Sequence, residues 1–129
     1  MLEETTKRLA TGRNFAALST LLPDGQPMTQ VMWVDADDDH LLVNTETGRQ
    51  KFRNVCRDPR VTVTIIDSDS PYRYAEVRGR VVDTVTGERA RAHIDELSNK
   101  YTGGPYDPAA IGTERVILVI EPGRQRAKT

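Results

Sequence analysis

Basic and hydroxyl side chains gather in one short turn of this chain, between an apolar segment and a helical one. Arg49 offers a planar guanidinium that can grip two oxygens at once, and Lys51 adds a point charge two residues later. Thr45 and Thr47 can add hydroxyl donors, and the start of a helix presents unpaired backbone N–H groups and the positive end of its dipole. Together these groups suit a phosphate monoester or diester. The same basic residues could instead serve only to solvate a helix, because a lone basic helix start is not specific.

No other set of side chains forms a recognisable acid–base or nucleophilic apparatus. The two histidines, His40 and His93, have no second ligand at metal spacing, so a zinc site is not expected. Neither a GxSxG nucleophile elbow nor a Walker-type phosphate loop is present. The only cysteine, Cys56, shares a predicted apolar helix face with Phe52 and Val55, so we expect it to be buried packing rather than a nucleophile. If the chain is an enzyme, its chemistry belongs to a cofactor.

The composition restricts the class of protein further. A length of 129 residues favours one domain, residues 1–129, and 37% hydrophobic with 29% charged residues is typical of a globular chain. With 18 Lys and Arg against 19 Asp and Glu, the net charge of −1 argues against a general nucleic-acid or membrane-surface binder. Aromatic residues make up only 5%, too few for a base-stacking platform. No apolar run is long enough for a membrane helix or a signal peptide, so we expect a cytoplasmic protein.

Alternating apolar residues and turn signals predict six strands and three helices around this turn. The expected strands are residues 15–21, 26–35, 40–45, 61–66, 72–85 and 115–122, and the expected helices are a short one ending at Gly12, then 49–57 and 87–101. Residues 35–39 are expected to form an acidic hairpin tip and 123–129 a basic tail, while Gly79 inside a strand predicts a bulge or a close backbone approach. Because the strands follow one another as hairpins, the pattern favours a mainly β (α+β) antiparallel barrel with helices outside.

Three segments carry a family resemblance. They are ALSTLLPDGQPMTQVMWVD (17–35), LLVNTETGRQKFRNVCRDPRVTV (41–63) and YRYAEVRGRVV (72–82). In these segments the chain resembles the pyridoxamine 5'-phosphate oxidase-like split β-barrel superfamily, and more narrowly its coenzyme F-420-dependent (PPOX-class) oxidoreductases of actinobacteria. The resemblance implies a six-stranded antiparallel split barrel of the FMN-binding type. It also implies an oxidoreductase that moves a hydride from a reduced deazaflavin, coenzyme F-420, to a small unsaturated or heteroaromatic acceptor.

The resemblance further implies the residues of a cofactor site, although no catalytic side chain is certain. The implied set is Gln30, Val31, Met32, Trp33 and Val34 along the ring, Asn44, Thr45, Arg49, Gln50 and Lys51 around the phosphate, and Tyr72 and Tyr74 from a second subunit. A large apolar residue such as Trp33 can equally be part of a core or a dimer interface. The proton for the reaction could come from solvent, Tyr72 or Tyr106.

Two other functions are compatible with the sequence, and a second copy of the chain is the expected partner. The same fold could hold FMN in a flavin reductase or oxidase, or the chain could be a non-catalytic protein that binds or stores a cofactor. The oxidases that make pyridoxal phosphate carry further C-terminal Arg and Trp residues, and this chain has no tryptophan after Trp33, so that activity is not expected. Residues 28–34 are apolar on both faces of their strand, which predicts a two-fold homodimer with cofactor sites at the subunit interface.

Overall fold

The computed structural model describes residues 1–129 and contains seven strands, three α-helices and one 3-10 helix. The strands are β1 (Phe15–Leu21), β2 (Pro27–Met32), β3 (Asp35–Ala36), β4 (Leu41–Glu46), β5 (Arg60–Ile66), β6 (Tyr74–Val85) and β7 (Arg115–Lys128). The helices are α1 (Glu4–Thr11), α2 (Gln50–Arg57), α3 (Glu88–Thr102) and the 3-10 helix η1 (Pro108–Ala110). No helix is long and apolar enough to cross a membrane.

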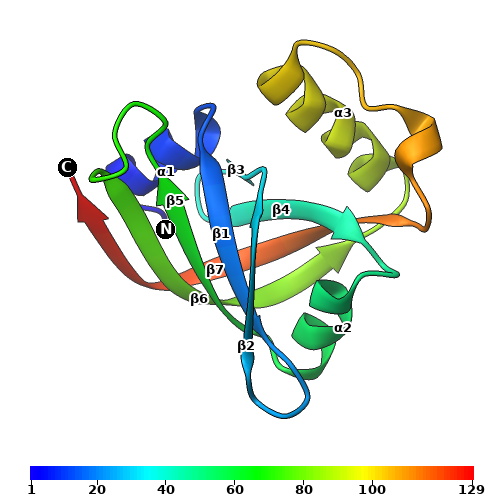
Figure 1. The fold of residues 1–129 in the computed structure, drawn as a ribbon, viewed down its shortest axis with the longest axis horizontal. Coiled ribbons are helices and arrows are strands. Elements are labelled where there is room, and N and C mark those ends of the chain that lie inside the picture. Colours follow the sequence, from blue (N-terminus) through cyan, green and yellow to red (C-terminus); the bar gives the residue numbers. More distant parts are fainter.

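All seven strands belong to one antiparallel sheet with the order β2-β1-β5-β6-β7-β4-β3. The two edge strands, β2 and β3, follow each other in the chain with only Trp33 and Val34 between them. Two residues span only a few ångströms, so the sheet must curl until its edges approach each other. Figure 1 shows the resulting barrel, with β6 and β7 sweeping as long curved strands behind β1, β2 and β5.

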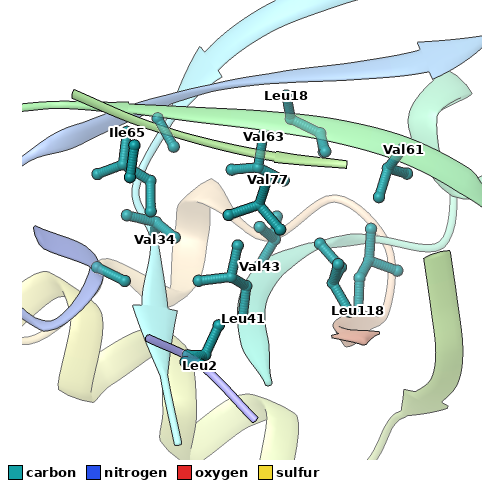
Figure 2. Packing of buried hydrophobic residues seen from close by; sticks show 14 of the residues in the cluster. Leu2, Leu18, Val34, Leu41, Val43, Val61, Val63, Ile65, Val77 and Leu118 are labelled. Atoms are coloured by element: carbon teal, nitrogen blue, oxygen red, sulfur yellow. The ribbon is translucent and has the colours of Figure 1, made fainter. Parts of the chain in front are cut away.

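Strand alternation fills the interior of this barrel. In β5, Val61, Val63 and Ile65 are buried while Thr62 and Thr64 are only partly covered, as the sequence pattern predicts. Side chains from strands on all sides of the barrel meet these residues in a single cluster of 17 buried hydrophobic residues. Figure 2 shows Leu18, Val43, Val77 and Leu118, among others, converging there.

The three helices cover different parts of the sheet. Leu9 and Ala10 of α1 join the main interior cluster at one end of the barrel. Helix α3 packs outside the barrel against β4 and β7, and Figure 1 shows it above the end of β4. Its buried stripe of Ala90, Ile94, Leu97 and Tyr101 is the one that its helical spacing predicts.

The number of strands differs from the expected six. The segment read as one strand, residues 26–35, is divided into β2 and β3, because the chain must cross from one sheet edge to the other at Trp33 and Val34. Asp35 and Ala36 therefore pair with Leu42 and Leu41, and the acidic turn shortens to residues 37–40.

Two further expectations are wrong. The basic tail is strand, because β7 continues to Lys128 and pairs with β6 as far as Tyr74. Cys56 is exposed rather than buried. The buried side of α2 is centred on Asn54 and Val55, since the Asn54 amide donates to Thr20 Oγ1 (3.0 Å) and accepts from Gln50 Nε2 (2.8 Å). A polar residue whose hydrogen bonds are satisfied has thus taken the buried position that the apolar pattern assigned to cysteine.

The expected close approach at Gly79 is confirmed. A Cβ at this position would lie 2.3 Å from the carbonyl oxygen of Glu121 on β7, and the β6–β7 register shifts between Arg78 and Gly79. Only glycine lets the two long strands meet here, and this bulge helps them bend around the barrel.

Candidate functional site

A buried ion pair lies at the foot of the predicted anion-binding turn. Glu46 ends β4 and Arg115 begins β7, and the two residues are direct partners in the antiparallel register. Both are buried, with 3% and 8% of their surface exposed, and Arg115 Nη1 donates to Glu46 Oε2 at 3.2 Å. Charged residues are rarely this buried unless they are paired, so the pair fixes both side chains in one arrangement.

The Glu46 carboxylate also organises the loop that precedes β7. Its Oε1 atom accepts hydrogen bonds from the backbone N–H groups of Gly112 (2.9 Å) and Thr113 (2.6 Å) and from the Thr113 hydroxyl (3.0 Å). Burial alone would raise the pKa of the Glu46 carboxyl, but these bonds and the charge of Arg115 outweigh burial and hold the pKa below its usual range. Glu46 is therefore a permanent negative charge at neutral pH.

Two cations contact this single carboxylate, and a third cation, Lys51, lies close to both of them. Arg49 Nη2 lies 3.7 Å from Glu46 Oε2, and Arg115 Nη1 lies 3.2 Å from the same oxygen. Lys51 is half-buried, and its amine makes no hydrogen bond or ion pair within the chain. Burial lowers the pKa of Lys51, and the charges of Arg49 and Arg115 lower it further. The cluster of Arg49, Lys51 and Arg115 therefore carries more positive charge than Glu46 neutralises, which favours an added anion.

The beginning of α2 strengthens this preference. The backbone N–H groups of Thr47 and Gly48 are used within the chain, by Glu114 O and the Thr113 hydroxyl. Those of Gln50 and Lys51, in the first turn of the helix, have no acceptor. The first turn contains no acidic residue, although acidic side chains normally stabilise this end of a helix. A bound anion would satisfy these N–H groups and the helix dipole together.

An apolar cleft of about 330 Å³ adjoins the cation cluster. It is lined by Phe15, Val31, Met32, Trp33, Asn44, Ile94, Leu97, Tyr106 and Arg115. Seven of these nine residues are aliphatic or aromatic, and the other two are Asn44 and Arg115. A largely apolar cleft with a few converging polar groups is the usual form of a small-molecule site.

Arg115 joins the cleft to the cation cluster. Its Nε donates to Asn44 Oδ1 at 2.9 Å and its Nη1 to Glu46, while its Nη2 has no acceptor within the chain. The guanidinium also lies over the ring of Tyr106, with its central carbon 5.3 Å from the ring centroid. Two of the three guanidinium nitrogens thus hold the group in place, and the third is left for a ligand.

Aromatic stacking fixes the floor of the cleft. The Trp33 ring stacks on Tyr101 with centroids 5.1 Å apart and planes 4° from parallel, and Tyr106 meets Trp33 edge-on. The Tyr101 hydroxyl is itself held between the Asn14 carbonyl and the Val34 N–H. A rigid indole at the junction of β2 and β3 gives the cleft a flat wall suited to a planar ring.

The structure brings some of the residues implied by the resemblance together. Val31, Met32, Trp33 and Asn44 line the cleft, and Arg49 and Lys51 lie in the cation cluster. Contact of the other six with a cofactor stays a prediction. Gln50 begins α2 beside the cation cluster, but its side chain bonds to Asn54. The remaining five line neither the cleft nor the cluster: Gln30 is exposed on β2, Val34 and Thr45 are buried, Tyr72 is exposed, and Tyr74 begins β6.

Sequence reasoning missed Glu46 and Arg115. The sequence does show one signal, since Arg115 stands directly before the apolar run VILVI and Glu46 directly after LLVNT. Oppositely charged residues at the ends of two strands predict an ion pair only when the strands are known to be neighbours. Glu46 and Arg115 are 69 residues apart in the sequence, so the sequence alone does not show that β4 and β7 are neighbours.

The chain is similar to several known proteins. The sequence matches the family described as pyridoxamine 5'-phosphate oxidase over residues 2–127. A solved F-420 reductase is 36% identical over 97% of this chain and 98% of its own, with a TM-score of 0.84. A conserved hypothetical protein from Mycobacterium tuberculosis is 25% identical over 98% of this chain and 84% of its own, with a TM-score of 0.68.

A more distant structure shows the same fold. General Stress Protein 26 from Bacillus anthracis is 21% identical over 96% of this chain and 91% of its own, with a TM-score of 0.68. Among curated protein sequences, none matches this chain. The family match spans nearly every residue, and the fold agrees with it, so the chain belongs to the pyridoxamine 5'-phosphate oxidase family.

Proposed function

We propose that this protein is an oxidoreductase that uses coenzyme F-420 and transfers a hydride to a small unsaturated or heteroaromatic acceptor. The observation that carries the proposal is the cation cluster of Arg49, Lys51 and Arg115 at the end of an apolar, aromatic-walled cleft. This combination matches the two parts of a deazaflavin, a phosphate on a polar chain and a flat ring. The 36% identity to an F-420 reductase supports the choice of a deazaflavin over other flavin-type cofactors.

The cation cluster is suited to hold the phosphate. Lys51 and Arg49 each supply a charge with at most one partner in the chain, and Arg115 supplies its unpaired Nη2. The N–H groups of Gln50 and Lys51 add neutral donors at the start of α2. Hydrogen bonds from charged donors each contribute about 1.5–3 kcal/mol to binding, so two or three of them are enough for micromolar affinity when the ring also binds.

The cleft is suited to hold the ring and to keep water away from it. Trp33 cannot rotate freely because Tyr101 stacks on one face and Tyr106 meets its edge. Met32 and Val31 extend this wall along β2. A bound deazaflavin would supply the hydride from its ring carbon C5, and the protein would accelerate transfer chiefly by orienting the ring and the acceptor. Tyr106, which lines the cleft, is a candidate proton donor.

The site is also proposed to be shared between two subunits. Val31 is 70% exposed and Phe15 is 49% exposed, and both line the cleft. Exposed apolar side chains beside a ligand site are typical of a surface that a second subunit covers. A two-fold partner would close the open side of the cleft and could bring Tyr72 and Tyr74 to it.

Titration with F-420 and with FMN, followed by fluorescence quenching, tests the proposal. We expect micromolar or tighter binding of F-420 and weaker binding of FMN. FMN bound more tightly than F-420, or a yellow protein purified from a host without F-420, would favour a flavin reductase or oxidase of the same fold. Tight binding of F-420 without turnover of any enone, quinone or tetrapyrrole would favour a binding or storage protein, and no binding of F-420 would refute the proposal.

A further inference from the structure

A chain of hydrogen bonds leads from the cleft to a buried histidine on the outer helix. His93 of α3 has no exposed surface, and both of its ring nitrogens have partners. Asn44 Nδ2 lies 3.1 Å from His93 Nδ1, and His93 Nε2 lies 3.1 Å from Asp35 Oδ2. Asn44 lines the cleft and accepts the Nε hydrogen bond of Arg115. The order of contacts is therefore Asp35, His93, Asn44, Arg115.

The partners of Asn44 leave its amide only one orientation. An arginine Nε can only donate, so the Asn44 atom that faces Arg115 must be the carbonyl oxygen. A backbone carbonyl can only accept, so the atom that faces the Ala90 oxygen at 3.0 Å must be the NH2 group. The same NH2 group faces His93 Nδ1, which must therefore be an unprotonated acceptor. The imidazole proton then lies on Nε2 and is donated to Asp35.

This proton position also bears on a cluster of possible metal ligands. The ligand atoms of Asp35, His93 and Glu96 lie within 4.8 Å of one another, although no sequence spacing links Asp35 to the other two. A metal at this cluster would need the lone pair of His93 Nε2, and that atom carries the proton. A metal-bound histidine also normally donates from its other nitrogen, whereas His93 Nδ1 meets the donor NH2 group of Asn44. The contacts thus favour a hydrogen-bonded relay over a metal site.

We propose that His93 is a positioning residue for the cofactor site: its Nδ1 acceptor holds the Asn44 amide, and Asn44 in turn holds the Arg115 guanidinium with Nη2 free for the anion. His93 does not touch the cleft itself, so its effect passes through Asn44. The identity of the anion as a cofactor phosphate rests on the proposed function, but the relay is a property of the free protein. The relay thus connects α3, which lies outside the barrel, to the anion-binding group through Asn44.

The relay depends on which nitrogen of His93 carries the ring proton. A second ring proton, on Nδ1, would face the Asn44 NH2 group, so two donors would oppose each other in a buried position. Asn44 could restore that contact only by rotating its amide, which would turn its NH2 group toward Arg115 Nε. An unprotonated Nδ1 is therefore needed to keep the Asn44 oxygen on Arg115 Nε. The charged and titratable groups around His93 are Asp35 from β3, Glu96 and Lys100 from α3, Arg89 beyond Glu96, and Arg115 from β7.

Two substitutions separate the two halves of the relay. In His93→Asn, the side-chain oxygen replaces Nδ1 and can still accept from Asn44, but the contact with Asp35 is lost. In His93→Gln, the side-chain nitrogen replaces Nε2 and can still donate to Asp35, but nothing accepts from Asn44 at the δ position. If His93 only fills space or pairs with Asp35, His93→Gln should be the milder change. The proposal predicts the opposite order.

Nitrogen-15 NMR of the free protein tests the relay without any cofactor. The wild type should show His93 with Nδ1 unprotonated and Nε2 protonated, and the Arg115 Nε–H should exchange slowly with water. That exchange should stay slow in His93→Asn and become at least tenfold faster in His93→Gln. A proton on Nδ1 of the wild type would overturn the proposal, as would equal Arg115 exchange in the two variants. The wild-type measurement decides the question even if His93→Gln does not fold.

Binding then links the relay to the cofactor. The dissociation constant for F-420 should rise about tenfold in His93→Gln, as expected for weakening one charge-assisted contact, and less than threefold in His93→Asn. Equal losses in the two variants would overturn the positioning role. If the wild type binds neither F-420 nor FMN, the proposed function fails while the NMR result still decides the relay.

Discussion

Arg49 and Lys51 occupy positions that a helix of this length does not favour for its own stability. Cations at the N-terminus of a helix oppose its dipole, and α2 has no acidic residue in its first turn to offset them. Lys51 is moreover half-buried beside two arginines. Residues that lower local stability are concentrated at functional sites. Binding of an anion would explain why two cations stand at this helix start.

The charge of Lys51 should make cofactor affinity depend on alkaline pH. Burial and its cationic neighbours place the pKa of the Lys51 amine below 10.5 in the free protein, and a bound anion raises that pKa again. Binding therefore takes up a proton, and affinity falls as pH rises through the free-protein pKa. Titrating F-420 from pH 7 to pH 10 should show this decline in the wild type. Lys51→Arg should remove it, and an unchanged pH profile in this variant would contradict the role of Lys51.

The sequence was sufficient to predict part of this site and not the rest. Arg49 and Lys51 could be predicted because they stand within one turn, where spacing alone brings them together. Glu46, Arg115 and the Asp35–His93 contact could not, because each depends on strands or helices that meet from distant parts of the chain. The burial of Asn54 in place of Cys56 could not be predicted either, because Thr20, the hydrogen-bond partner of Asn54, lies 34 residues away in the sequence.

At the scale of elements, the short crossing between β2 and β3 determines where the cleft forms. Trp33 and Val34 join the two edges of the sheet, and they point in different directions: Val34 into the barrel and Trp33 into the cleft. A single predicted strand over residues 26–35 is what local alternation favours. Only the neighbours of each edge, β1 for β2 and β4 for β3, show that the segment must be divided.

The close approach of β6 and β7 should not tolerate a side chain at Gly79. Gly79→Ala places a Cβ against the backbone oxygen of Glu121, so the strands must separate, and we expect a loss of about 2–3 kcal/mol in the free energy of unfolding. Gly104→Ala is the matched control, because nothing lies within 4 Å of its Cβ position. Denaturant titration of both variants measures the difference. Equal stability of the two variants would show that the bulge is not a tight constraint.

At the scale of the whole molecule, one chain leaves its cleft open beside exposed apolar residues. Val31, Phe15 and Val82 are all more than 45% exposed, and the first two line the cleft. The interior of the barrel, in contrast, is fully filled by the 17-residue cluster. The hydrophobic core therefore lies within one chain, whereas the proposed site would be closed by a second chain.

A homodimer should be observed in solution. Light scattering should give a mass near twice 14.4 kDa for the wild type. Val31→Glu, which places a charge on the most exposed apolar residue of the cleft, should shift the protein toward a monomer. Ala92→Glu adds the same charge to an exposed position on α3 and should leave the mass unchanged. A monomeric wild type would contradict both the dimer and the shared site.

The most direct test of the cation cluster compares a deazaflavin with and without its phosphate, in the wild type and in Lys51→Met. The wild type should bind the phosphorylated form at least about 100-fold more tightly, and Lys51→Met should reduce that preference about tenfold while leaving affinity for the dephosphorylated form unchanged. Arg124→Met, which removes the same charge from the exposed face of β7, should leave the preference intact. Equal binding of the two forms by the wild type, or a preference that Lys51→Met does not alter, would contradict the assignment of the phosphate to this cluster.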